Sequence, residues 1–363
     1  MQEALSSVEA EGSEPDSSAA HAAPRRLRGL RFWLGLVEME LFKLRRRRLT
    51  KVLFATQMGL LVLVLGTIAL LYSSIQAQPL SYFGPQATPC ATSTPGSAAP
   101  GQSAPCPTAT PTDADREATR ASVLADFQQY FVPPLAVTLI IEFTRATSLF
   151  LIAILAGAVI GGEYSLGTIR LLFSRGPGQI QLMTAKIVAL ALAVLVGIGL
   201  TMVLGAGIGL VLALLTGAPV QWSFLTLDFA WRSVLLWVVT TLALMIYALV
   251  ALLAATLTRS SAGGIAGAII YAVVERAASN LLPFFASRLT SPAISAFFLK
   301  VQVYLMDANV SALIQRSESG PLATGTLPAT LPSTSHALVT LGLYGLVCVV
   351  LSMLLVFRRD VAS

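Results

Sequence analysis

The polar residues best suited to binding a partner are concentrated in one short segment between two long apolar runs. These residues are Glu163, Tyr164, Gly167, Thr168, Ile169, Arg170, Phe173 and Arg175, and Lys186 follows them. Three apolar residues of the segment would share one helix face, and Gly176-Pro177-Gly178 must end that helix. A short helix with an exposed apolar edge fits a groove on a partner protein. The alternative is a plain loop whose charges are solvated at a membrane surface.

A second group of charges, Glu275 and Arg276, lies within an otherwise apolar run. Placing an ionisable side chain at the centre of a bilayer costs at least about 2.5 kcal/mol, so such a pair indicates a polar pathway or a gate. The alternative is a span that ends at Val274 and leaves both charges at the membrane interface. Asn280 and Pro283 follow closely and favour this alternative.

Cysteine, histidine and nucleotide-binding chemistry are sparse. Cys90 and Cys106 share one Pro-rich loop, and two alternatives stay open for them: a disulfide on an oxidising face of a membrane, or two free thiols. Cys348 lies in an apolar run, which predicts a packing role. The two histidines do not predict a metal cluster or a catalytic triad. The chain also lacks the phosphate-binding pattern G-x-x-x-x-G-K-[ST], so we expect no enzyme activity and no directly bound cofactor.

Long apolar helices must position these residues. Only 12% of the 363 residues are charged, against about 25% in an ordinary soluble domain. A helix needs about 20 apolar residues to cross a bilayer, and continuous apolar runs exclude a membrane barrel. Six runs qualify, so we predict an all-α polytopic membrane protein. The predicted spans are 52–72, 144–162, 187–215, 233–257, 262–282 and 337–357.

The distribution of basic residues predicts the orientation. Ten Lys and Arg residues lie between Arg25 and Lys51, immediately before the first span. Positive residues stay on the cytoplasmic side of a membrane, which places the N-terminus inside. With six spans, 16 of the 24 basic residues fall on that side, and both termini are cytoplasmic. Because these residues lie next to the membrane, the positive net charge does not predict a nucleic-acid partner.

The region before the first span has two parts. Residues 1–24 are acidic and rich in Ser, Ala and Pro, which predicts a disordered tail. Residues 25–50 carry leucines and a valine at alternating steps of three and four, which predicts an amphipathic helix in the cytoplasmic membrane interface. Its basic and aromatic contacts would be Arg28, Arg31, Trp33, Lys43, Arg45 and Arg46. Alternatively, the run Arg45–Arg48 only stops translocation at the first span.

Two external loops complete the predicted 51–363 membrane domain. Residues 73–126 are rich in Pro, Thr and Ser and are expected to be extended or disordered. Residues 127–141 are interpreted as an outer extension leading into the second span. Residues 284–335 are also expected outside, with one amphipathic helix that packs on the spans through Phe297, Val301, Tyr304, Leu305 and Leu313.

The order of these features resembles the membrane subunits of type-2 ATP-binding-cassette (ABC) exporters. The resemblance rests on the basic entry helix with Lys43-Leu44-Arg45-Arg46, six spans, a large first external loop, and the ending Phe357-Arg358-Arg359-Asp360. It also rests on the acidic residue after the second span, followed by Gly167-Thr168-Ile169-Arg170, a Gly/Pro break and Lys186. It covers roughly residues 30–363, apart from the Pro-rich loop.

The resemblance implies a permease of the bacterial cytoplasmic membrane that pairs with a separate ATPase. ATP would bind to that partner, and the segment 163–186 would be the coupling helix that docks onto it. Glu163, Gly167, Thr168 and Arg170 would lie at the contact. A second permease subunit, identical or paralogous, would complete the transport pathway.

Two other classes of function stay open. An ion-coupled secondary transporter would need an intramembrane site for the coupling ion, for which Glu275 is the candidate. A membrane anchor or sensor that does not transport would use the Pro-rich loop to bind its partner.

Overall fold

The computed structural model describes residues 25–83, 112–165, 178–218, 220, 222–318 and 331–360. Every regular element in these ranges is a helix. Six of the helices are long and apolar enough to cross a membrane, which indicates a multi-pass membrane protein. They are α2 (Arg48–Gln76), α4 (Leu135–Ser165), α6 (Gln179–Thr216), α7 (Leu227–Thr258), α8 (Ser261–Arg288) and α11 (Thr334–Asp360).

All six predicted spans fall on these helices, but the helices extend beyond the predicted ends. Helix α4 begins at Leu135, nine residues before the predicted start, so the extension at 135–141 is continuous with the second span. Helix α6 begins at Gln179, so Lys186 lies two turns inside it. The extension of α6 begins with polar residues such as Gln179 and Gln181, whereas the extension of α4 at 135–141 is mostly apolar.

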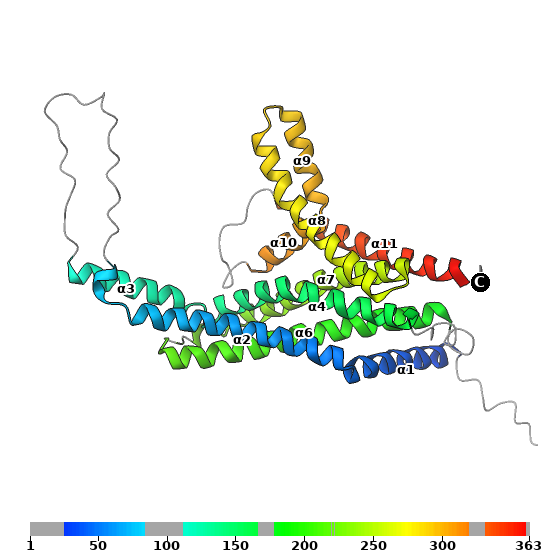
Figure 1. Ribbon diagram of the computed structural model, residues 1–363, viewed down its shortest axis with the longest axis horizontal. Coiled ribbons are helices and arrows are strands. Elements are labelled where there is room, and N and C mark those ends of the chain that lie inside the picture. Colours follow the sequence, from blue (N-terminus) through cyan, green and yellow to red (C-terminus); the bar gives the residue numbers. More distant parts are fainter. Residues whose placement is uncertain are drawn as a thin grey trace, which may run out of the picture.

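The long helices run roughly along the longest axis of the molecule (Figure 1). Helix α1 (Arg25–Arg46) and the C-terminal end of α11 lie at one end of this axis, which we call the α1 end. Helix α3 (Asp113–Gln128) lies at the opposite end, called the α3 end. The later half of α8 and helix α9 (Pro292–Tyr304) form a hairpin that projects from the side of the bundle (Figure 1).

Helices α4, α7 and α8 form the centre of the bundle. Helix α7 is the most enclosed of the six, with 72% of its most apolar window buried. Close contact between α4 and α8 depends on Gly161, because a Cβ there would lie 2.3 Å from the Ser261 Cα. Gly157 meets Ile265 and Ser261 one turn earlier along the same seam. Small residues thus let two apolar helices approach at backbone distance.

The first external loop contains helical structure that its composition did not predict. Helix α3 forms within residues expected to be extended, and Thr112 caps it by accepting a hydrogen bond from the Asp115 N–H. Asp115 in turn accepts from the Thr112 N–H, which completes a capping box. A short 3-10 helix, η2 (Leu80–Phe83), follows α2. Most of the loop was expected to be extended or disordered; residues 113–126 are helical instead, and residues 84–111 lie outside the described part.

The second external segment holds two helices where one was predicted. Helices α9 and α10 (Met306–Ser317) meet at Leu305 and are bent by 70°. Leu313 on α10 packs into the core, whereas Phe297 and Tyr304 on α9 are exposed. The expected apolar face is therefore divided between two helices: α10 packs into the core, whereas α9 packs along α8 and leaves Phe297 and Tyr304 exposed.

Helix α1 covers residues 25–46 of the region 25–50 for which one interfacial helix was predicted, and a break at Arg47 separates it from α2. Its position in a membrane interface stays a prediction. Val37 and Leu44 of the predicted apolar stripe are buried, but Leu30, Leu34 and Leu41 are at least one-third exposed. The buried residues face the start of α6, and the exposed residues form an adjacent strip. The predicted stripe is therefore divided into a buried part that packs on the bundle and an exposed part.

Candidate functional site

A buried ion cluster joins three helices at the α1 end of the bundle. The Lys186 Nζ of α6 lies 2.5 Å from the Glu163 Oε1 of α4 and 3.0 Å from the Glu40 Oε2 of α1. The Lys43 Nζ donates a hydrogen bond of 2.8 Å to the other carboxylate oxygen of Glu40. These four residues are called the Lys186 cluster. Two ammonium groups face two carboxylates, so the cluster is electrically balanced.

Most of the charged groups in the Lys186 cluster are buried, so they depend on their ion pairs for stability. The Lys186 and Glu40 side chains are each 4% exposed and that of Glu163 is 11% exposed, whereas Lys43 is 36% exposed. A buried charge is tolerated only when it is paired and hydrogen-bonded. Burial alone would raise the pKa of the Glu40 carboxyl, but Lys186 and Lys43 stabilise its charged form and hold that pKa below its ordinary value.

The helix pattern of α1 explains why Glu40 reaches Lys186. Glu40 lies on the same face as Leu36, Val37 and Leu44, which are all buried. One turn before this apolar group, the Trp33 indole N–H donates a hydrogen bond of 3.1 Å to the Thr184 hydroxyl. Trp33 therefore has a protein partner on α6 in addition to any role at a membrane surface. Helix α1 is fixed along the first turns of α6.

Two residues of the Lys186 cluster, Glu163 and Lys186, flank in sequence the segment that the sequence singled out. Glu163 lies two residues before the end of α4, and Lys186 follows the start of α6 by two turns. Tyr164 belongs to α4 by its backbone. The other residues predicted at a partner contact, Gly167, Thr168, Ile169, Arg170, Phe173 and Arg175, lie outside the described residues. The structure therefore describes the residues on either side of this segment and the Lys186 cluster that joins them.

Sequence reasoning found three of the four cluster residues and missed Glu40. Lys43 was predicted as a surface contact, and it pairs with Glu40 instead of standing alone. Three of the other predicted basic contacts on α1 are exposed: Arg31, Arg45 and Arg46. The side chain of Arg28 lies outside the described residues. An acidic residue on the apolar face of α1 was the available signal for Glu40.

The pair Glu275 and Arg276 lies within a continuous helix, and whether the membrane-crossing part ends at Val274 stays a prediction. Helix α8 continues to Arg288, 14 residues beyond the proposed end at Val274, with Pro283 inside it. Adjacent helix residues point about 100° apart, and the two side chains diverge accordingly. Glu275 is buried and its Oε1 accepts a hydrogen bond of 3.1 Å from the Asp307 N–H in the first turn of α10. Glu275 thereby caps α10 from another helix.

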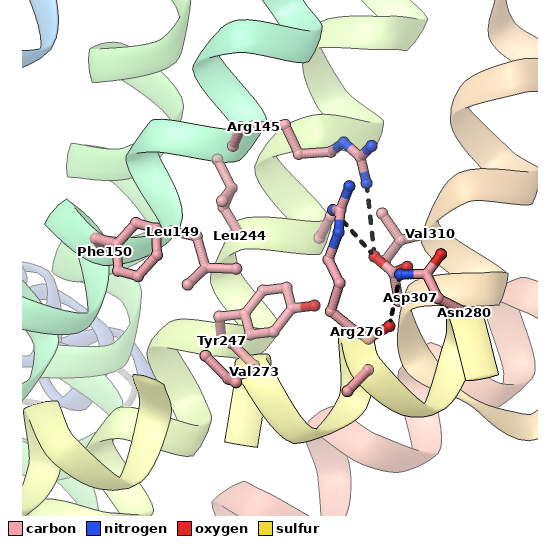
Figure 2. A pocket seen from close by; sticks show the side chains of 14 residues that line it. Arg145, Leu149, Phe150, Leu244, Tyr247, Val273, Arg276, Asn280, Asp307 and Val310 are labelled. Carbon is pink, nitrogen blue, oxygen red and sulfur yellow. Dashed lines mark hydrogen bonds and ion pairs between the residues drawn. The ribbon is translucent and has the colours of Figure 1, made fainter. Parts of the chain in front are cut away.

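Arg276 faces a pocket of about 440 Å³ between α4, α7, α8 and α10. Its NH1 lies 3.8 Å from the Asp307 Oδ1, and the Arg145 NH1 from α4 lies 3.7 Å from the same oxygen. Both arginines approach Asp307 from different helices (Figure 2). Leu149 and Phe150 lie on the other side of the pocket (Figure 2). Charged and apolar groups are thus separated within one pocket.

Of the three cysteines, the structure describes only Cys348. Cys348 is buried and free, as a packing residue in α11 should be. Cys90 and Cys106 lie outside the described residues, so their pairing stays a prediction.

Comparison with protein-family models, with curated proteins and with solved structures finds no match to this chain. The function must therefore be argued from the chain's own residues.

Proposed function

We propose that this chain is the membrane subunit of an ABC exporter in a bacterial cytoplasmic membrane. It would pair with a separate cytoplasmic ATPase and with a second permease subunit. ATP hydrolysed by the ATPase would drive movement of a substrate through the six spanning helices. The order of sequence features that resembles type-2 ABC exporters supports this proposal, as do six apolar helices.

The observation that carries the proposal is the Lys186 cluster. A soluble ATPase can move spanning helices only if the segment that it binds is connected to them rigidly. The cluster joins α1 to the end of α4 and the start of α6, and residues 166–177 connect these two helices in sequence. A displacement of that segment would therefore be passed to three helices together. The Trp33 to Thr184 hydrogen bond stiffens the same junction. This is the mechanical arrangement that a coupling helix requires.

Charge and exposure support a cytoplasmic α1 end. Arg45, Arg46 and Arg48 are exposed there, and the positive-inside rule favours the cytoplasmic side for them. The exposed strip of Leu30, Leu34 and Leu41 lies beside these basic residues. An apolar strip next to basic residues suits the headgroup region, with anionic lipids as neighbours. Helix α1 would then lie in the inner membrane interface.

Co-purification from the native host tests the proposal. We expect a tagged full-length chain to retain a soluble ATPase that carries the pattern G-x-x-x-x-G-K-[ST]. A triple variant, Glu163→Gln with Gly167→Trp and Arg170→Glu, should lose that ATPase and lose ATP-dependent export while still reaching the membrane. The matched control is Tyr82→Glu in η2, an exposed residue at the α3 end, which should retain both. Full export by the triple variant would refute the proposal.

A further inference from the structure

The pocket between α4, α7, α8 and α10 has two arginines at one end. Among the side chains that line it, Arg145 and Arg276 are cationic and Asp307 is the one anion. Charge-assisted hydrogen bonds between arginine and carboxylate measure about 2.7 to 2.9 Å, whereas the pairs of Asp307 with Arg145 and Arg276 are 3.7 and 3.8 Å long. Asp307 is therefore not a close acceptor for either guanidinium, although it lies near both.

Neither arginine is fully occupied by other groups. Arg145 donates a hydrogen bond of 2.8 Å to Glu142, which is not a lining residue, and its buried Nε has no hydrogen-bond partner within the described part. The Arg276 side chain is 61% exposed, and Asp307 is its one ion-pair partner among the described residues. Arg276 lies 15 residues after the first residue of α8.

The opposite end of the pocket is apolar and open. Leu149, Phe150, Leu244 and Val273 line it, and Phe150 and Val273 are each about half exposed. Figure 2 shows Leu149 and Phe150 across the pocket from Arg276 and Asp307. The volume of about 440 Å³ falls in the range of small-molecule sites, about 300 to 1,000 Å³. The pocket thus matches a ligand with one acidic end and one hydrocarbon end.

We propose that this pocket binds an anionic amphiphile, with Arg145 and Arg276 holding its acidic headgroup and the apolar end holding its hydrocarbon chain. The bidentate fork of a guanidinium suits a phosphate or carboxylate headgroup. Asn280 lines the same pocket and adds an uncharged amide to it. The inference does not rest on the proposed export function, because it concerns binding to the chain alone.

Native mass spectrometry of the purified, delipidated full-length chain tests this inference. The probes are dioleoyl phosphatidylglycerol and dioleoyl phosphatidylcholine, which share their hydrocarbon chains and differ in net charge. We expect the first bound lipid to be phosphatidylglycerol, with at least about tenfold preference, because the quaternary ammonium of phosphatidylcholine offsets its phosphate charge and is repelled by the two arginines. Glycerol phosphate alone should not compete, because it lacks the hydrocarbon chain. Equal binding of the two lipids, or full competition by glycerol phosphate, would overturn the proposal.

Two matched variants locate the binding site. Arg276→Gln should remove the preference for the anionic lipid, whereas Arg276→Lys should keep part of it. Arg288→Gln changes another exposed arginine of α8 outside the pocket and should leave the preference unchanged. Phe150→Ala should weaken binding of both lipids. The same spectra report the oligomeric state. If Arg276→Gln instead dissociates a dimer with lipid preference unchanged, the pocket is a subunit contact and the proposal is wrong.

Discussion

At the scale of single residues, Lys186 is a buried cation that depends on its ion pairs. Its ammonium group stands between two buried carboxylates that come from different helices. Glu40 also pairs with the Lys43 Nζ at 2.8 Å, so the two carboxylates share two ammonium groups. Removing Lys186 would leave excess negative charge in a buried place.

Replacing Lys186 by Met should therefore lower the free energy of unfolding by about 3 to 5 kcal/mol, the usual effect of breaking a buried pair by removing one partner. Equilibrium unfolding in a mild detergent measures this change. Lys43→Met is the matched control, because Lys43 is more exposed and its pair with Glu40 is worth at most about 1 kcal/mol. Equal losses in the two variants would show that the Lys186 cluster carries no special stability.

Acidification should release helix α1. The Glu40 pKa lies below its ordinary value of 4.5 in the folded chain, because Lys186 and Lys43 stabilise the carboxylate against the opposing effect of burial. A lowered pKa contributes stability that is fully present above 4.5 and is lost as the pH falls through the folded-state pKa. Hydrogen exchange of α1, corrected for intrinsic rates, should stay slow from pH 7 to 5 and accelerate below 4.5. The Glu40→Gln variant should lack this transition, and an identical transition in that variant would rule out Glu40 as its source.

At the scale of elements, the seam between α4 and α8 shows how backbone contact fixes helix positions. A Cβ on Gly161 would meet the Ser261 Cα, whereas a Cβ on the adjacent Gly162 would meet nothing within 4 Å. The two neighbouring glycines thus differ only in what they face. The seam leads directly to Glu163 and hence to the Lys186 cluster.

Gly161→Ala should therefore destabilise the chain by about 1 to 3 kcal/mol through overpacking. Gly162→Ala should instead be neutral or stabilise it by about 0.5 to 1 kcal/mol, because alanine is a better helix former than glycine. Thermal unfolding of both purified variants makes the comparison. A drop in Tm for Gly162→Ala as large as that for Gly161→Ala would contradict the described seam.

The elements also show what residue patterns can and cannot predict. The six apolar helices follow from run length, because backbone groups in hydrocarbon must be satisfied within a helix. Helix α3 was missed because the local capping box of Thr112 and Asp115 outweighs a composition averaged over the loop. The bend at Leu305 and the capping of α10 by Glu275 were also missed. Glu40 escaped notice because its partner lies 146 residues away, and pairing at that separation leaves no periodic signal.

At the scale of the whole molecule, we propose that the α1 end and the α3 end face opposite sides of the membrane. The α1 end holds the exposed basic residues of α1 and the C-terminal end of α11 (Figure 1). The α3 end holds α3 and η2, which flank the Pro-rich residues 84–111. Six spans give both termini the same side, and the positive-inside rule predicts that this side is the cytoplasm.

Cysteine labelling of intact cells checks this orientation. In a background in which the native cysteines are replaced by serine or alanine, Tyr82→Cys should react with a membrane-impermeant maleimide. Arg31→Cys should react only after the membrane is opened. Both side chains are exposed, so protein burial does not distinguish them. The reverse pattern would invert the topology and place the Lys186 cluster outside.

The central claim is that residues 166–177, held by the Lys186 cluster, form the contact with a cytoplasmic ATPase. A photo-crosslinking amino acid at Ile169 tests it most directly, with the same amino acid at Tyr82 as the control. The account predicts that Ile169 forms a cross-link to a soluble protein that carries G-x-x-x-x-G-K-[ST], and that Tyr82 forms none. If Ile169 forms no cross-link to an ATPase in membranes where export is active, residues 166–177 are not the ATPase contact.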